Sequence, residues 1–526
     1  MFGSSSPLQV VPPLPIDADA RESTRWEHTR LRRRLLYGEW EDDLVTRISQ
    51  QVGTVRRQAW GRPDLSANPF RSLCAQLAVL YDRAPVISHP DDLDGKAAEA
   101  LTAALQRAGA WSLMARVQRD TIGLREMLVR VDICEDDGRL LLRPVAPSLV
   151  IADPDPQDPS RCSRLREARL RREPETKLIG WTWDVVTPSA GTYAITRSDG
   201  TTDVTSTYEP AGLSGDRYPA RLAGTVDELT GELLPGRPVL PYAWYHASQT
   251  GCLWDAWEGF ELVEGTLQVG VYWTFWGHIL KMASWPQRYA AGFVPAGSTQ
   301  EGDAEGNRAE VVTDPATLLL LQRLADDSGQ GLIGQFQPGG DPAVVGDAII
   351  VYEKRVIGNA GLAPPDFVRQ SGDPRSGYAL SISKEGQREA ARRMEPQQRR
   401  GDEQLLTLCA AALNRWSERQ GAPLGLPELG WRIRYEAIPL SPDEQAALRE
   451  QVMGDYSAGL IDKPDAYIAL NPGTTRPEAI RRLAEIAAAN RPMDRLLPPT
   501  PQRRLRVGLE DDESNTSDEG GTDGNE

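Results

Sequence analysis

The segment from residue 253 to residue 284 is apolar on two sides of one predicted helix. Two rows of apolar residues recur there at helical spacing, with Leu253, Trp257, Phe260, Leu267, Val271, Phe275, Ile279 and Met282 in one row and Val269, Trp273, Trp276 and Leu280 in the other. A helix with two apolar faces is usually buried on both. At about 1.5 Å per residue it is about 50 Å long. The pattern therefore predicts a long helix that packs laterally against its neighbours.

The composition limits the classes of protein to which this chain can belong. It has 526 residues, a formal net charge of −16 and a sequence pI near 5.0, which argue against a free-standing nucleic-acid binder. Five scattered cysteines without a Cys-x-x-Cys pair predict neither a disulfide framework nor a zinc site. The N-terminus lacks a signal-peptide pattern, and the apolar stretch 264–281 is too short to span a bilayer. We therefore expect a soluble protein that is intracellular when it is synthesised.

The sequence lacks the patterns of common catalytic sites. It contains neither Gly-x-x-x-x-Gly-Lys-Ser/Thr nor Gly-x-Ser-x-Gly, and its four histidines are far apart. Asp153, Asp155 and Asp158 are close in sequence, but prolines separate them and no calcium-loop glycine or distal glutamate follows. A turn is therefore favoured over a metal site. We expect no catalytic residue, no cofactor-binding residue and no metal ligand.

Hydrophobic periodicity divides the chain into helices and strands and predicts an α+β fold. Helical spacing is found over 21–57, 93–108, 111–127, 314–324, 341–361, 383–419, 443–454 and 476–490, and Asn68-Pro69-Phe70 begins a further helix. Strands are predicted over 128–133, 140–145, 178–186, 191–197, 202–208, 332–336 and 431–438. The Arg-rich segment 161–172 is interpreted as a solvated helix, because acidic residues interleave with its arginines.

A Pro/Gly-rich loop lies between two helical segments and ends in Ser376-Gly377-Tyr378-Ala379-Leu380. Together with the order helix, Gly-rich insertion, helix, this loop resembles the tunnel-loop region of the portal proteins of tailed bacteriophages, and the resemblance extends over about 26–495. It implies the portal fold, with a flexible N-terminal arm at 1–25, an α+β wing at 26–250, a first stem helix at 251–291, a clip at 292–340, a second stem helix at 341–362, a tunnel loop at 363–381, a wing spine helix at 382–425, a helical crown at 426–495 and a disordered acidic tail at 496–526.

The resemblance also implies a function. Portal subunits form a ring, usually a homododecamer, at the unique capsid vertex of the virion, and double-stranded DNA enters and leaves the head through the ring channel. The implied partners are the terminase large subunit, head–tail adaptor proteins, and the major capsid and scaffolding proteins, with assembly in the host cytoplasm and no membrane. The implied role is structural, without enzymatic activity.

Two groups of residues would carry this role. The tunnel loop would present Arg369, Gln370, Ser371, Asp373 and Arg375 to DNA, although these arginines could equally serve solubility and intersubunit salt bridges. Lateral packing between stem helices would use Trp257, Phe260, Leu267, Val271, Phe275 and Ile279.

Two other classes of protein stay open at this point. A minor head or scaffold protein of a phage virion has a similar helix-rich architecture, and it would be favoured if the helices 253–284 and 341–359 were not antiparallel. A nuclease that uses Asp153 and Asp155 would show metal-dependent cleavage that is lost on alanine substitution of those residues.

Overall fold

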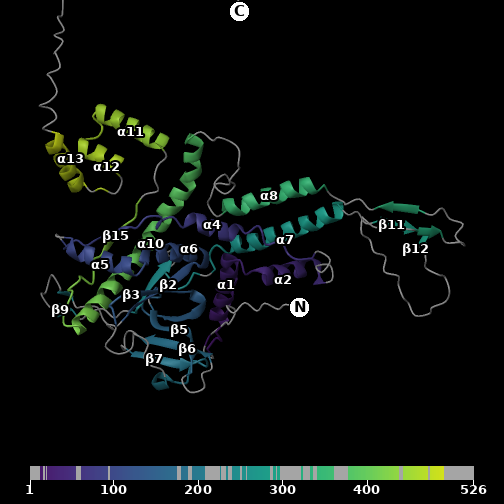
Figure 1. The fold of residues 1–526 in the computed structure, drawn as a ribbon, viewed down its shortest axis with the longest axis horizontal. Helices are drawn as coiled ribbons and strands as arrows, with labels where there is room; N and C mark the ends of the chain where they lie inside the picture. Colours follow the sequence, from purple (N-terminus) through teal and green to yellow (C-terminus); the bar gives the residue numbers. More distant parts are fainter. Residues whose placement is uncertain are drawn as a thin grey trace, which may run out of the picture. The chain divides into compact units, whose positions relative to one another are not determined.

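The chain forms two compact units, residues 1–445 and 446–526, which are described separately. The computed structural model describes residues 12–15, 18, 20–54, 61–92, 95–134, 136–160, 162–173, 179–187, 192–207, 225–226, 233–234, 240–248, 251–255, 257–284, 288–291, 293–295, 321–323, 332–335, 341–359, 377–436, 442–471, 474 and 476–490. The described residues of the first unit combine helices with antiparallel sheets (Figure 1), and the fold is therefore α+β as predicted.

A three-stranded antiparallel sheet in the order β10-β2-β3 lies at the centre of the first unit, formed by β2 (Glu126–Ile133), β3 (Leu140–Val145) and β10 (Tyr242–His246). Every residue of β2 is buried. The 43-residue helix α10 (Gly377–Arg419) packs across β10 and β2. The approach is close because Gly401 has no side chain: a Cβ there would lie 2.5 Å from the ring of Tyr245.

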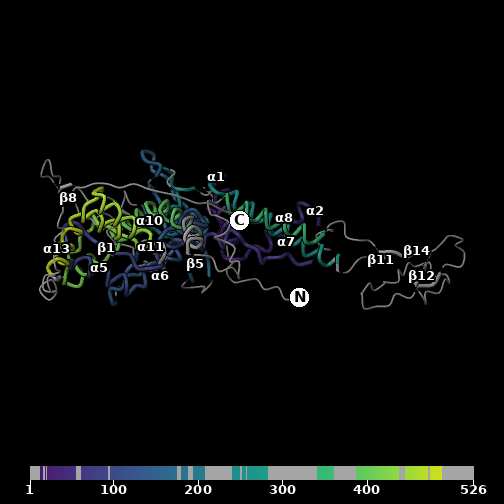
Figure 2. Tube along the Cα trace, turned by 90° about the horizontal axis from the view of Figure 1, so that it is seen from above, coloured from purple at the N-terminus to yellow at the C-terminus, as the bar shows by residue number. Residues whose placement is uncertain are grey.

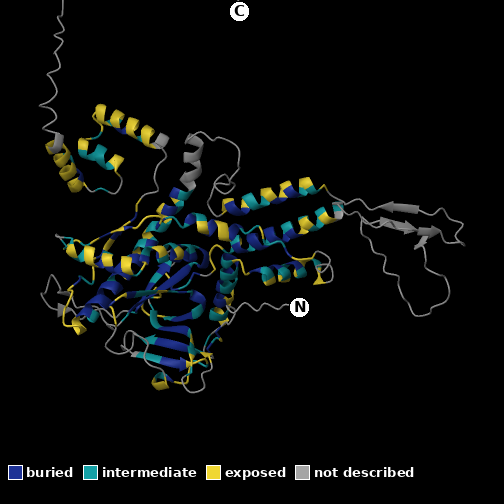
Figure 3. Cartoon of the chain, in the orientation of Figure 1, coloured by how far each residue is buried: buried dark blue, intermediate teal, exposed yellow. Residues whose placement is uncertain are grey.

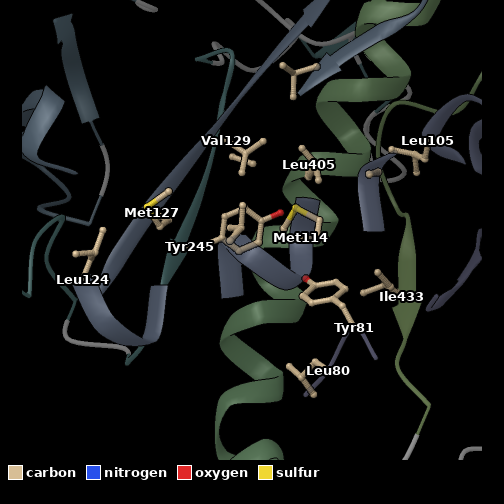
Figure 4. Packing of buried hydrophobic residues seen from close by; sticks show 14 of the residues in the cluster. Leu80, Tyr81, Leu105, Met114, Leu124, Met127, Val129, Tyr245, Leu405 and Ile433 are labelled. Carbon is tan, nitrogen blue, oxygen red and sulfur yellow. The ribbon is translucent and has the colours of Figure 1, made fainter. Parts of the chain in front are cut away.

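A buried carboxylate fastens α10 to the elements around it. Asp402 accepts hydrogen bonds from the hydroxyls of Tyr81 (2.6 Å), Tyr245 (2.9 Å) and Tyr435 (2.5 Å). Gln398, one turn earlier on α10, donates to the Tyr81 hydroxyl at 3.0 Å. Figure 4 shows Tyr81 and Tyr245 reaching α10 from different parts of the chain, among Met114, Leu405 and other core residues. These contacts set the position of α10 on the sheet.

A four-stranded antiparallel sheet, β4-β5-β6-β7, packs beside the central one and is formed by β4 (Val150–Pro154), β5 (Cys162–Arg172), β6 (Ile179–Thr187) and β7 (Thr192–Arg197). The prediction of a helix over 161–172 is therefore wrong. Leu165 of β5 packs towards Leu128 and Tyr242 of the central sheet, whereas Ala168 packs with Trp26 and Trp183. Both faces are covered in the middle of the strand, where residues 165–168 are buried, and Arg166, Arg169 and Arg171 pair with carboxylates.

An ionic cluster fills part of the contact between the two sheets. Arg130 on β2 and Asp184 on β6 are completely buried, with 3.2 Å between guanidinium and carboxylate. Arg169 (3.2 Å) and Arg171 of β5 also pair with Asp184, and Arg130 contacts Glu167 at 2.9 Å. Burial alone would raise the pKa of Asp184, but the hydrogen bond from Arg171 and the surrounding positive charges hold it below its usual value.

The N-terminal helices of the first unit have boundaries that differ from several predictions: α1 (Ala20–Tyr37), α2 (Glu41–Val52), α4 (Pro69–Leu77), α5 (Lys96–Arg107) and α6 (Ala110–Leu124). Of these, α5 and α6 pack on the central sheet. The helix predicted over 21–57 is two helices, because Gly38 adopts a left-handed φ of +80° that interrupts it. The helix predicted over 111–127 ends at Leu124, since Arg125 has φ 76° and its side chain pairs with Asp255 and Glu258. The predicted start at Asn68 is confirmed, because its side chain caps α4.

Short strands complete the first unit: β1 (Val86–Ser88) with β15 (Arg432–Arg434), β8 (Thr225–Val226) with β9 (Leu233–Leu234), β11 (Arg288–Ala291) with β14 (Leu332–Gln335), and β12 (Phe293–Pro295) with β13 (Leu321–Arg323). Two 3-10 turns also occur, η1 (Pro147–Leu149) and η2 (Thr205–Thr207). The strand predicted over 202–208 is wrong, because only a single bridge joins Asp203 to Thr196 before η2. Residues 321–323 form a strand, where a helix over 314–324 was predicted.

The second unit contains α11 (Pro442–Ser457), which begins just before it, α12 (Lys463–Leu470) and α13 (Arg476–Asn490). The helices over 443–454 and 476–490 are confirmed, and α12 was not predicted. Residues 426–445, which the predicted crown included, belong to the first unit. Within the described ranges, no helix meets the length and apolarity needed to cross a membrane.

Candidate functional site

Two helices, α7 (Phe260–Ser284) and α8 (Pro342–Asn359), form an antiparallel hairpin beside the sheets (Figures 1 and 2). Gly265 lies against Val356, and Tyr272 contacts Tyr352 at 5.2 Å between ring centroids. At the other end the Trp276 indole donates to the Pro342 carbonyl at 2.8 Å. As residue numbers increase along α7, the contacted residue numbers on α8 decrease. The two helices are therefore antiparallel.

The hairpin begins later in the chain than predicted, because α7 has 25 residues and starts at Phe260, not at Leu253. Upstream, the Asp255 amide donates to the Glu126 carboxylate on β2, and Gly259 has a left-handed φ of +67°. The left-handed Gly259 does not continue a helix, and the Asp255 amide bonds to β2 instead of to a carbonyl of a helical turn. At about 1.5 Å per residue α7 is about 37 Å long. Helix α8 lies within one or two residues at either end of its predicted range.

Glycines let the helices of this region approach one another closely. A Cβ at Gly265 would lie 2.8 Å from Val356 on α8, and one at Gly270 would lie 2.7 Å from the Trp40 ring next to α2. A Cβ at Gly346 would lie 3.1 Å from the Trp276 indole nitrogen. Separations below 3.0 Å force a backbone or side chain to shift. The glycines thus set the separation of α2, α7 and α8.

Polar contacts anchor α7 to the rest of the first unit. Arg47 on α2 pairs with Glu264 at 2.6 Å. The buried hydroxyl of Thr266 accepts from the Phe70 amide at 3.2 Å, and that of Thr274 accepts from the Asp64 amide at 2.9 Å. Helices α2, α4 and α8 consequently cover the apolar faces of α7. The predicted burial of both faces is confirmed for much of the helix, but the covering elements belong to the same chain.

The structure separates the predicted stem-packing residues into two groups. Leu267 and Val271 are buried in the chain's own core, so they offer no surface to another subunit, which corrects their assignment. Phe260 stacks on His28 with 4.3 Å between ring centroids, and Ile279 is half-buried. Trp257 and Phe275 are exposed, and Trp257 lies before the start of α7. An intersubunit role for the exposed residues stays a prediction.

An exposed apolar row on α8 was not predicted. Val344 and Val351 are 65% and 66% exposed, and exposed Ala348 lies between them on the same side of the helix. Ile350 nearby is also exposed, and Figure 3 shows this outer side of α8 as largely exposed. The signal was present in the sequence as apolar residues at i, i+4 and i+7. We call Val344, Ala348 and Val351 the α8 row.

The predicted loop residues Arg369, Gln370, Ser371, Asp373 and Arg375 lie outside the described residues. The described chain resumes at Gly377, where α10 begins, so residues 377–381 of the predicted loop are helical. Among the described residues, no group of three or more His, Cys, Asp and Glu side chains could hold a metal ion. Asp153, considered as a nuclease ligand, faces Arg166 at 3.5 Å.

Replacing Gly265 with Ala is expected to lower the free energy of unfolding by about 1–3 kcal/mol, because the added methyl overlaps Val356 across the hairpin. Gly277 on the same helix is the matched control, since no atom lies within 4 Å of its Cβ position. Gly277→Ala is expected to stabilise the protein by about 0.5–1 kcal/mol through helix propensity. Urea unfolding of both variants checks this, and equal effects would contradict the close packing.

Comparison with known proteins gives only distant similarity. No protein-family model matches the sequence, and no curated protein matches it. Among solved structures, one similar chain is described as "Neck of native GTA particle computed with C12 symmetry", with 12% identity, a TM-score of 0.36, and coverage of 78% of this chain and 91% of that chain. Another is described as "Virion of native gene transfer agent (GTA) particle", with 12% identity, a TM-score of 0.35, and coverage of 79% and 96%. At TM-scores this low, the similarity carries no argument for a shared fold.

Proposed function

We propose that this chain is a structural subunit of a phage-type virion and, more specifically, a portal protein whose copies form a ring around a DNA channel. The observation that carries the proposal is the antiparallel α7–α8 hairpin. It supports the portal interpretation over a minor head protein, which helices that are not antiparallel would have favoured. The ring would pass DNA during packaging and ejection and would dock terminase and head–tail adaptors.

The order of elements along the chain supports the same proposal. Strand β11 follows α7 after three residues, β14 precedes α8, and these two strands pair antiparallel. The two chain segments therefore stay paired beyond the helices, as a stem that leads into a clip requires. The 43-residue helix α10 comes next and rests on the sheets, as expected for a wing spine helix.

The α8 row provides a surface on which a second copy would pack. Large apolar side chains exposed along one helix side favour contact with another protein surface. When one face of a subunit packs on a different face of the next, the subunits form a closed ring if the rotation between neighbours is a whole-number fraction of a full turn. The net charge of −16 per chain fits a DNA channel, since repulsion limits lasting adhesion to the phosphates. The loop containing Arg369 and Arg375 would supply transient contacts.

Replacing Val351 with Asp is expected to abolish ring formation and leave folded single subunits, because assembly would bury an unpaired carboxylate. Val351 is 66% exposed, so the fold of the subunit should not change. Leu424→Asp is the matched control, since Leu424 is 49% exposed and lies after α10. Native mass spectrometry of both variants checks this. Rings of normal size from Val351→Asp would overturn the assignment of the α8 row to the subunit interface.

A further inference from the structure

The second unit has very little core of its own. Among its described residues, only Val452 and Ala479 are buried apolar residues. Large apolar side chains are exposed on all of its elements, namely Met453 (60%), Tyr456 (37%), Leu460 (74%), Leu470 (37%), Ile480 (52%) and Ile486 (44%). Figure 3 shows α11 and α13 as mostly exposed. Large apolar side chains exposed together on one unit favour contact with another protein surface.

Local contacts in this unit do not replace a core. Asp462 caps α12 by accepting from the Asp465 amide at 2.8 Å, and Arg476 pairs with both carboxylates at 2.5 Å. Helix α12 packs on α13, but α11 makes no comparable contact with either. The three helices have 16, 8 and 15 residues. Helix α12 is shorter than the about 12–15 residues below which isolated helices are marginal in water, and α11 and α13 are close to that limit. Packing on another surface would therefore stabilise them.

Exposed residues, most of them apolar, form one row along α11 and another along α13. On α11, Ala446, Glu450 and Met453 recur at i, i+4 and i+7 and are all exposed, and exposed Leu460 follows three residues after the helix ends. On α13, Ile480, Ala484 and Ala487 recur at i, i+4 and i+7 and are all exposed. We call these the α11 row and the α13 row.

The two rows also differ in charge. Glu450 lies within the α11 row, and Arg481 lies next to Ile480 beside the α13 row. Both side chains are exposed, and neither has an ion-pair partner among the contacts of the described chain. A carboxylate on one row and a guanidinium on the other are complementary when the rows face each other, which steers partner choice and orientation. The complementarity favours a second copy of this chain as the partner.

We infer that the second unit is a self-association element in which the α11 row of one subunit packs on the α13 row of the next, so that the unit folds stably only in the assembled ring. This inference rests on the proposed function, because a head-to-tail contact of this kind needs a ring to close. It adds an interface separate from the α8 row and places Glu450 opposite Arg481 of the neighbouring subunit. The exposed apolar side chains would then be covered in the ring.

Hydrogen exchange of the full-length protein tests the inference. Amides of 446–490 are expected to exchange about tenfold or more slowly in wild-type rings than in the unassembled Val351→Asp subunit, because exchange follows local unfolding. Amides of the buried strand β2 provide the internal control and should be protected in both states. Equal exchange of 446–490 in the two states would overturn the inference.

Charge reversal identifies the rows that meet. Glu450→Arg should restore fast exchange of 446–490 in the ring, and the double variant with Arg481→Glu should return it to the wild-type rate. Glu485→Arg is the control, since Glu485 is exposed on α13 and already pairs with Arg482. Failure of the double variant to recover would overturn the Glu450–Arg481 pairing.

Two outcomes distinguish this inference from the proposed function. If wild-type protein forms no rings, the proposed function fails as well. If rings form without slow exchange in 446–490, only this inference fails.

Discussion

Asp184→Ala is expected to lower the free energy of unfolding by about 3–5 kcal/mol, the cost of breaking a buried ion pair by removing one partner. Arg130 has no solvent exposure, and Arg169 and Arg171 converge on the same carboxylate. Without Asp184, Arg130 and Arg169 would keep their pairs with Glu167, but all three guanidinium groups would lose the carboxylate on which they converge. Urea unfolding followed by circular dichroism measures the change.

The control for this prediction is an ion pair in the same sheet that lies at the surface. Arg197 and Glu173 are 3.4 Å apart, with side chains 59% and 30% exposed. Glu173→Ala is expected to cost less than about 1 kcal/mol, because solvent screens the pair. A loss of less than 1 kcal/mol for Asp184→Ala would show that the cluster does not contribute to the contact between the sheets.

Asp402→Ala is expected to destabilise the protein by more than about 3 kcal/mol. Three tyrosine hydroxyls donate to this one carboxylate, and each buried donor left without an acceptor costs about 1–3 kcal/mol. The change should also loosen α10 from β10, which hydrogen exchange of the Tyr242–His246 amides would detect. Glu418→Ala on the same helix is the control, because Glu418 is half exposed and pairs with Arg415 at the surface. Equal effects of the two substitutions would contradict this account.

The same carboxyl predicts a pH dependence. Burial raises the pKa of Asp402 from 3.8 to about 6, against the opposing effect of the three tyrosine hydrogen bonds. The folded state therefore holds its proton more tightly than the unfolded chain does. This contribution to stability is complete below about pH 4 and is lost as the pH rises towards about 6, a change of about 3 kcal/mol.

Asp402→Asn removes this titration, so the wild-type protein should lose about 3 kcal/mol relative to the variant between about pH 4 and 6. Urea unfolding at several pH values gives this difference directly, and titrations common to both proteins cancel. A flat difference across that interval would show that Asp402 does not hold a raised pKa.

The long helices could be predicted because their apolar spacing is set by their own residues. Helix α8 and the C-terminal half of α10 agree with the predicted ranges closely. The antiparallel orientation of α7 and α8, by contrast, depends on contacts such as Gly265 with Val356, which lie 91 positions apart. Sequence periodicity cannot specify that pairing.

The strand β5 was misread because its polar residues are buried by distant partners. A segment with so many arginines normally faces water, and its charges support helices well. Here Arg169 and Arg171 pair with Asp184 on the next strand, and Arg166 pairs with Asp153. The interleaved charges therefore favoured a solvated helix. The α8 row was missed for the opposite reason, since exposed apolar residues look like core residues in a sequence.

Native mass spectrometry of the purified full-length protein, combined with symmetry analysis of negatively stained particles, tests the central claim most directly. The account predicts a closed ring with a central hole and about twelve copies of the chain, held by head-to-tail contacts. A stable monomer or dimer at high protein concentration, with α8 still exposed, would contradict it.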